Sequence, residues 1–524
     1  HVLSQYVEGK RKEWDAYRTH VSDWEVDKYL VLFCRFVTML IHMGISFFVY
    51  RTMKHFTASR QALAIAGVYF AILPKRFYTP EFSLMMSWFL TLLILTLLQL
   101  LLLQDRPGGF RKILLLILSG VWMCALVLSY PSCILLFPFV LLGFILFRKS
   151  MPKGGVWIFT GTIVLIAALY VGRLLSYLEF RRVPSIVKEA LRACGSHEFN
   201  AKDKFLYNGS HFLIMAGLCA ATMLLSCLLV SVKDLFRHKK GKPAFGEVLL
   251  LSVILGLAAQ IVLLFIPYFE THVTNSFDHY HYFLMLFGGV AAIIKGRGRM
   301  NVPERFLAFG MVLNGIGFIA VFLLTNLTIF TSVRYLTSGF AISFYFILKE
   351  LPPKAETKRS LIGPVFVIAF LLNVYNLLDY SCNNGYVWNI SKVQRMIRYG
   401  ASKGVLCEYM TGYIFDTTHE EWEQYVEDGD TVLIWDFSTM EYLNRDVRIG
   451  TYTTLSTPTY YVDSMEEYLR MNPDKYPDVI AVSCWYGELN LETDYGHFYE
   501  WIEDRYHADT VIDGAYYRYF IRRR

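Results

Sequence analysis

The stretch "ILPKRFYTPEFSLMMSWFLTLLILTLL", residues 72–98, places a short polar segment before a long apolar run. The apolar run extends from about residue 83 to about residue 104, long enough for a helix that crosses the ~30 Å hydrocarbon core of a bilayer. Similar runs recur along the first 380 residues and then stop. The chain is 55% hydrophobic and only 18% charged, which is atypical of a soluble globular protein. The sequence therefore predicts an integral, multi-pass membrane protein.

The apolar runs predict about twelve membrane-spanning helices. Their approximate ranges are 29–51, 61–77, 83–104, 112–129, 132–148, 155–177, 211–232, 246–267, 280–295, 305–328, 335–349 and 361–379. The fourth and fifth ranges belong to one apolar run that Pro131 interrupts within "SYPS". Because proline ends helices, we expect a tight helical hairpin at this point.

The loops between the predicted spans alternate in their content of lysine and arginine. Basic loops such as "KDLFRHKKGK" (233–242) and "KGRGR" (295–299) alternate with other loops, of which 130–132 and 268–279 contain no Lys or Arg and 329–334 contains only Arg334. Because basic loops remain in the cytoplasm, the other loops are predicted to lie on the opposite side of the plasma membrane. The segments predicted outside are 1–28, 78–82, 178–210, 268–279 and the C-terminal region. A chain that starts outside is expected to have one further helix upstream.

Charge divides the chain into parts that face different surroundings. Residues 381–524 contain 13 Lys and Arg against 24 Asp and Glu, a net charge of −11. Residues 1–380 contain 38 against 20, a net charge of +18. We therefore expect a transmembrane domain over 29–380, preceded by the tail of an extracytoplasmic loop at 1–28, and a soluble extracytoplasmic domain over 381–524.

Helix and strand patterns alternate in the soluble region, which predicts an α/β domain. Two strand runs have apolar centres at Leu433–Trp435 and Val479–Val482, and "TVIDGAYYRYFIRR" predicts a terminal pair of strands. Helical spacing is present at 391–399, 419–428, 463–471 and 497–506.

Glu81 is the acidic residue of the predicted outside loop, and two interpretations of it remain open. Pro80 can begin the next helix, so that Glu81 occupies the first turn, where the helix dipole favours a carboxylate by about 0.3–1 kcal/mol. Alternatively, the carboxylate acts as a catalytic base, or binds an acceptor or a metal ion. Lys75 and Arg76, close to Tyr78, either bind a lipid phosphate at headgroup depth or only extend from a helix end toward water.

A second polar loop, "YFETHVTNSFDHYHYF" (268–283), concentrates acidic and histidine side chains. Two interpretations follow from the residues themselves: a site for a divalent metal ion, or solvated residues within an aromatic belt. The candidate residues are Glu270, His272, Asp278, His279 and His281.

This arrangement resembles the GT-C superfamily of polytopic membrane glycosyltransferases, which includes protein O-mannosyltransferases and lipid A aminoarabinose transferases. "FYTPEFSLMMSWFLTLLILTLL" (77–98) is similar to the family segment in which an acidic residue opens a helix. "LVLSYPSCILLFPFVLLGFILF" (126–147) is similar to its proline-bearing hairpin. The resemblance covers about 29–380 as a pattern. The acidic residue of the family's first loop belongs to the upstream part that we expect, and Asp23, Glu25 and Asp27 lie in the tail of that loop.

The resemblance implies transfer of a sugar from a polyprenyl-phosphate donor to a glycan, lipid or protein acceptor at the extracytoplasmic face. Glu81 would be catalytic, and Lys75, Arg76, Tyr78 and the polar residues of 268–283 would bind substrate. Many members of the family have an arginine near 268–283 for the lipid phosphate, and the resemblance implies that His279 and His281 contact the phosphate in its place. Two other functions remain open: a transporter or flippase of lipid-linked glycans, and a non-catalytic assembly protein whose soluble domain recruits partners. The predicted spans contain few charges, which argues against ion-coupled transport. The divalent ion is the only cofactor that these residues suggest, and we expect no nucleic-acid partner.

Overall fold

The computed structural model describes thirteen segments of the chain, in which helices predominate and strands appear toward the C-terminus. The described residues are 29–72, 82–103, 109–176, 201–236, 244–263, 280–323, 336–351, 363–364, 367–374, 393–435, 439–451, 462–483 and 496–522. The chain divides into two compact units. The helical unit comprises Arg35–Tyr170 and Phe199–Tyr380, and the C-terminal unit comprises His1–Cys34, Val171–Glu198 and Ser381–Arg524.

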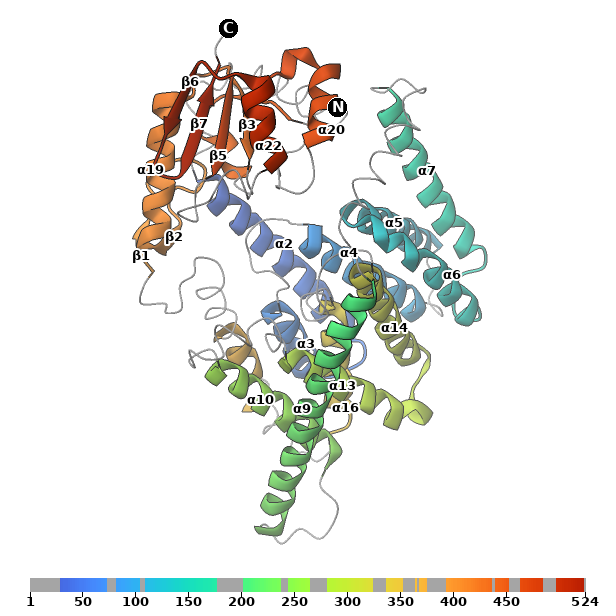
Figure 1. Ribbon diagram of the computed structural model, residues 1–524. Helices are drawn as coiled ribbons and strands as arrows, with labels where there is room; N and C mark the ends of the chain where they lie inside the picture. Colours follow the sequence, from blue (N-terminus) through green and yellow to red (C-terminus); the bar gives the residue numbers. More distant parts are fainter. Residues whose placement is uncertain are drawn as a thin grey trace. The chain divides into compact units, whose positions relative to one another are not determined.

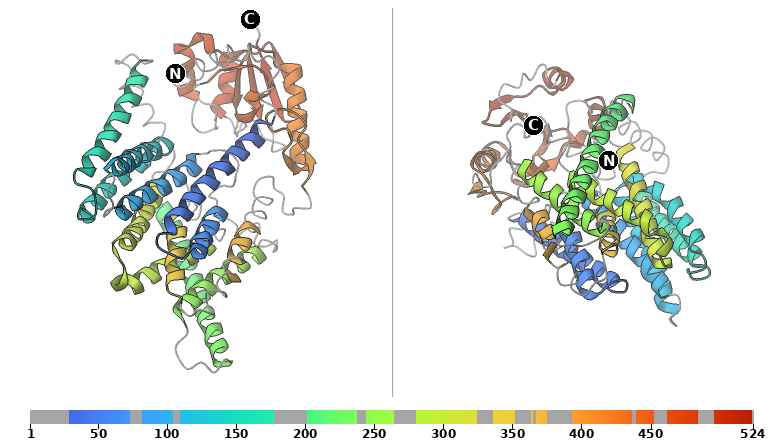
Figure 2. Two further views of the ribbon diagram at one scale, coloured as in Figure 1. Left: turned by 180° about the vertical axis from the view of Figure 1, so that it is seen from behind. Right: turned by 90° about the horizontal axis from the view of Figure 1, so that it is seen from below.

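The helical unit consists of α-helices and two short 3-10 helices within the segments that the structure describes (Figure 1). The helices are α2 (Leu30–Met53, whose first turn belongs to the C-terminal unit), α3 (Ser59–Ala71), α4 (Phe82–Leu102), α5 (Gly109–Ser129), η1 (Pro131–Leu135), α6 (Leu136–Leu146), α7 (Gly155–Leu175, whose end from Val171 belongs to the C-terminal unit), α9 (Ala201–Phe236), α10 (Phe245–Leu263), α13 (Tyr280–Gly296), η3 (Arg297–Arg299), α14 (Val302–Leu323) and α16 (Thr337–Lys349). α9 packs beside α10 and α13 (Figures 1 and 2).

Seven of the described helices are long and apolar enough to cross a membrane, which confirms the prediction of a membrane protein in its coarse form. They are α2, α4, α5, α7, α9, α10 and α14. The predicted hairpin break is confirmed as well, because α5 ends at Ser129 and η1 begins at Pro131. The total of about twelve spans stays a prediction. α9 begins at Ala201, so the end of the predicted loop 178–210 is helical.

Two helices form the centre of the helical unit. α16 is buried on all sides from Thr337 to Leu348. In α4, 78% of the residues in the most apolar stretch are buried. Small residues allow the helices around α16 to approach it closely, since Gly289 of α13 lies directly against Ser343. In α7, by contrast, only 11% of the residues in the most apolar stretch are buried, so this helix lies at the margin of the unit.

The C-terminal unit contains a five-stranded mixed sheet in the order β4-β3-β5-β7-β6. β3 pairs in parallel with β4 and β5, whereas β7 pairs antiparallel with β5 and β6. The strands are β3 (Thr431–Trp435), β4 (Arg448–Ile449), β5 (Val479–Ser483), β6 (Thr510–Asp513) and β7 (Tyr517–Ile521). The helices of this unit are α19 (Tyr409–Tyr425), η5 (Thr439–Leu443), α20 (Val462–Met471), η6 (Pro473–Lys475), α22 (Gly496–Trp501) and η7 (Ile502–Tyr506).

Helices cover both faces of this sheet (Figure 1). Successive strand residues point to opposite faces, so Leu433 and Trp435 pack with α20 and α22, while Val432 and Ile434 pack against α19. Trp422 of α19 is fully buried in the second of these cores. The predicted strand centres Leu433–Trp435 and Val479–Val482 are confirmed, and both are almost completely buried.

One predicted helix of this unit is wrong. Residues 391–399 were expected to be helical, but Val393–Met396 forms β1, paired antiparallel with β2 (Leu406–Glu408). The reason is the turn that follows, where Gly400 and Gly404 both adopt positive φ and reverse the chain. The other three helical predictions coincide with parts of α19, α20 and α22–η7.

Candidate functional site

Of the predicted site residues, His281 alone is among those that the structure describes. The others fall in two segments, 73–81 and 264–279, that lie outside the described residues. They are Lys75, Arg76, Tyr78 and Glu81 in the first segment, and Glu270, His272, Asp278 and His279 in the second. Their roles stay predictions, and the described side chains that border each segment define the surroundings of the candidate site.

The helices that border segment 73–81 are joined by a buried polar cluster. α3 ends at Ala71 and α4 begins at Phe82, one residue after Glu81. His42 of α2 lies between them, with its ring stacked on Tyr69 of α3 at a centroid distance of 5.2 Å. Trp88 of α4 donates a hydrogen bond from Nε1 to His42 Nδ1 over 3.0 Å. The cluster therefore ties α2, α3 and α4 together near the ends of the predicted loop.

The contacts of His42 define its protonation state. Nδ1 accepts a hydrogen bond from the Trp88 indole N–H, so the ring hydrogen must be on Nε2, which donates to the carbonyl oxygen of Phe70 over 3.2 Å. Both ring nitrogens are thus used by protein partners, and the neutral ring matches this burial. His42 is suited to hold the helix ends in place, not to exchange protons with a substrate.

A second branch of the cluster involves hydroxyl groups. The Tyr69 hydroxyl donates to Thr91 Oγ1 over 3.2 Å, and Thr91 Oγ1 donates to the Ser87 carbonyl oxygen over 2.8 Å. The hydroxyl donors of Tyr69 and Thr91 are therefore satisfied, as is required where water is excluded. The bond from Tyr69 to Thr91 joins α3 to α4, the two helices that border residues 73–81.

His281 is the second residue of α13, which begins at Tyr280 directly after segment 264–279. Its side chain is completely buried, and its ring lies 4.1 Å from the ring of Tyr282. Tyr282 in turn stacks on Phe340 of α16 at 4.7 Å. The start of α13 is therefore anchored in the aromatic core of the helical unit. Within the described ranges no group of three or more His, Cys, Asp or Glu side chains is arranged to hold a metal ion, so the metal site remains a prediction for the second loop.

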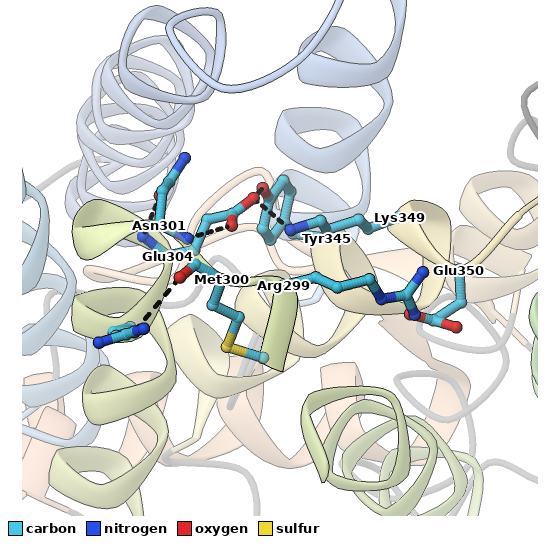
Figure 3. A network of polar contacts seen from close by, with 8 residues as sticks. Arg299, Met300, Asn301, Glu304, Tyr345, Lys349 and Glu350 are labelled. Atoms are coloured by element: carbon cyan, nitrogen blue, oxygen red, sulfur yellow. Dashed lines mark hydrogen bonds and ion pairs between the residues drawn. The ribbon is translucent and has the colours of Figure 1, made fainter. Parts of the chain in front are cut away.

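A polar network at the opposite end of the bundle was not foreseen from the sequence (Figure 3). Glu304 of α14 accepts hydrogen bonds at Oε1 from the Tyr345 hydroxyl over 2.7 Å and from Lys349 Nζ over 2.5 Å. Its other oxygen accepts from the backbone N–H of Asn301, while Asn301 Oδ1 accepts from the Glu304 N–H. This reciprocal pair is a capping box that begins α14.

Glu350 completes the network at this end of the bundle. Its carboxylate pairs with Lys295 at 3.1 Å and with Arg299 at 3.0 Å. The ion pairs join α13 and η3 to the residue that follows α16. Arg299 and Glu350 are drawn in Figure 3. The signal in the sequence was "NVPE" at 301–304, which has the spacing of a capping box, and the network can be explained by stability alone.

Comparison with known proteins gives little further information. No family model matches the chain. The glutamine synthetase of Clostridium saccharobutylicum is 60% identical to it over 30 residues, and that of Methanocaldococcus jannaschii is 55% identical over 31 residues. Each match covers 6% of this chain and 7% of the glutamine synthetase, so the chain spans a very small part of these relatives. Segments of this length establish neither a family nor an activity.

Proposed function

We propose that this protein is a membrane glycosyltransferase that transfers a sugar from a polyprenyl-phosphate donor to an acceptor at the extracytoplasmic face. In this proposal the spans number about twelve, and the C-terminal α/β domain lies on the same side of the membrane as the active site. The observation that carries the proposal is the position of Glu81. It directly precedes α4, in a segment whose bordering helices are joined by the His42–Tyr69–Trp88 cluster.

The chemistry of transfer gives the residues of this segment distinct roles. The acceptor hydroxyl must lose a proton as it attacks the sugar, and the Glu81 carboxylate is the proposed base. The departing lipid phosphate carries negative charge, which Lys75 and Arg76 would stabilise at headgroup depth. Rigid helix ends suit this task, because a catalytic group must be held close to its productive position.

Ion-coupled transport, the main alternative, is less well supported by the described helices. A proton-coupled transporter needs ionisable side chains within its spans that can exchange protons. His42 is the buried histidine within α2, and both its ring nitrogens are already hydrogen-bonded to Trp88 and Phe70. A non-catalytic assembly role differs from the proposal in one testable respect, since it does not require the Glu81 carboxylate.

The test is the substitution Glu81→Gln, which keeps the size of the side chain and removes its basicity. Loss of a general base lowers rates by about 10²–10⁴-fold, and we expect sugar transfer in lipid vesicles to fall within that range. The melting temperature should be nearly unchanged, because a carboxylate at a helix start contributes at most about 1 kcal/mol. Equal transfer rates with equal melting temperatures would show that Glu81 is only a helix-start residue.

A further inference from the structure

A cavity with a volume of about 640 Å³ lies in the helical unit, away from the predicted active-site loops. Its polar lining consists of Arg51 and His55 at and beyond the end of α2, Gln99 near the end of α4, and Arg111 at the start of α5. The apolar lining comes from leucine side chains of α4, the residue after it, and α5. These are Leu102, Leu103, Leu114 and Leu115.

Two hydrogen bonds between α2 and α4 show at which end of these helices the cavity lies. Trp88 of α4 bonds to His42 of α2, and ten residues further along α2, Thr52 accepts a bond from Gln99 Nε2 over 3.1 Å. α2 and α4 therefore run side by side in the same direction. The cavity is at the end of this pair, about 15 Å beyond His42 at 1.5 Å per residue. It thus lies at the end of α4 opposite to segment 73–81.

The charges at this cavity have no counter-charge among the described residues. Arg51 and Arg111 are exposed side chains, and the ion pairs between described residues involve neither of them. An arginine remains protonated at any physiological pH, and its guanidinium group matches the geometry of a phosphate. The cavity therefore combines two permanent cations with an apolar wall.

We propose that this cavity binds the phosphate headgroup of an anionic lipid. The arginines, with His55, would contact the phosphate oxygens, and the four leucines would contact the start of the lipid chains. A free phosphate shares the first set of contacts but not the second, and the leucine wall therefore favours the lipid. By the distribution of Lys and Arg this end of the bundle is cytoplasmic, so the site is separate from the proposed transfer site and does not depend on it.

The alternative without a binding site is that Arg51 and Arg111 only reach toward water from helix ends, as basic side chains often do at a membrane surface. That explanation predicts no preference for a particular lipid beyond general attraction to a negative surface. It also predicts that any exposed arginine at this end of the bundle has the same effect. Arg148, exposed in the turn after α6 and absent from the cavity lining, provides the comparison.

The experiment measures binding of dioctanoyl phosphatidic acid to the purified full-length protein in phosphatidylcholine nanodiscs. Dioctanoyl phosphatidylcholine and inorganic phosphate are the comparison ligands. We expect phosphatidic acid to bind at least about tenfold more tightly than either. The double variant Arg51→Gln/Arg111→Gln should lose about 100-fold in affinity, or about tenfold for each charge-assisted contact, while Arg148→Gln stays within about twofold of the wild type.

Leu114→Ser tests the apolar wall, because Leu114 is 43% exposed and its replacement should not disturb the packing. It should weaken binding of phosphatidic acid and leave binding of inorganic phosphate unchanged. Equal loss in the double variant and in Arg148→Gln would overturn the site. Equal affinity of the wild type for inorganic phosphate and phosphatidic acid would overturn the assignment to a lipid.

Discussion

Glu441 provides a sharp test of the energetics of the C-terminal unit. It lies in η5 and is only 2% exposed, and the Asn444 side-chain amide donates a hydrogen bond to its carboxylate. Burial raises the pKa of Glu441 to about 7, from an ordinary value of 4.5, and the bond from Asn444 opposes this change only partly. Replacing it with glutamine removes the ionisable group and keeps its size.

The direction of the effect follows from which state holds the proton more tightly. The folded unit retains the proton up to about pH 7, whereas the unfolded chain releases it near pH 4.5, so stability falls as the pH rises between these values. A shift of this size amounts to about 3 kcal/mol in total. About 2 kcal/mol of it is lost between pH 5.5 and pH 8. Glu441→Gln should abolish this dependence and stabilise the unit most above pH 7.

The assay is hydrogen exchange of the full-length protein, read at the amides of β3 and β5 and corrected for intrinsic rates at each pH. The free energy of opening in the wild type should fall by about 2 kcal/mol from pH 5.5 to pH 8, and it should stay level in Glu441→Gln. Glu423→Gln is the matched control, because the Glu423 side chain is 60% exposed. Parallel pH profiles for the wild type and Glu441→Gln would refute the reasoning.

Three further predictions concern topology and packing. Alkaline phosphatase fused after Arg524 should be active, because the basic loops place the C-terminus outside the cytoplasm, and an inactive fusion would reverse the orientation. The region 393–524, expressed alone, should unfold cooperatively, since it contains both sheet cores, and a disordered circular-dichroism spectrum would contradict this. Gly289→Ala should destabilise the helical unit by about 1–3 kcal/mol in a thermal melting assay, because a methyl group there would overlap Ser343. Gly161→Ala is the control and should be neutral or stabilising in the same assay, because a methyl group there meets no neighbouring atom.

The parts of the fold that the sequence predicted are those governed by local composition. Long apolar runs, the helix break at Pro131, and the buried strands around Leu433 and Ile480 each depend on residues within one short window. The error at 391–399 arose because turn geometry at Gly400 and Gly404 outweighed the helical spacing before it. The helical extension of α9 to Ala201 was missed because polar residues there do not extend the apolar pattern.

The candidate site depends less on local composition than the fold does. Glu81 was singled out because its charge is conspicuous between apolar runs, a signal that the sequence displays directly. His42 and Trp88 were not singled out, since they lie 46 positions apart and only the parallel course of α2 and α4 brings them together. The cavity beside Arg51 and Arg111 could not be predicted either, because it depends on where three helices end relative to one another.

The polar groups of the helical unit differ in how completely the protein itself satisfies them. His42 uses both ring nitrogens within the bundle, and Glu304 uses both carboxylate oxygens, so both side chains are already held by protein partners. Their replacement should therefore cost stability, since a buried partner would be left unpaired. Arg51 and Arg111 face a cavity and pair with no carboxylate of the described residues, so their replacement should cost binding and not stability. In a bundle this apolar, a ligand therefore gains the most binding energy from cations at helix ends that no protein carboxylate already pairs.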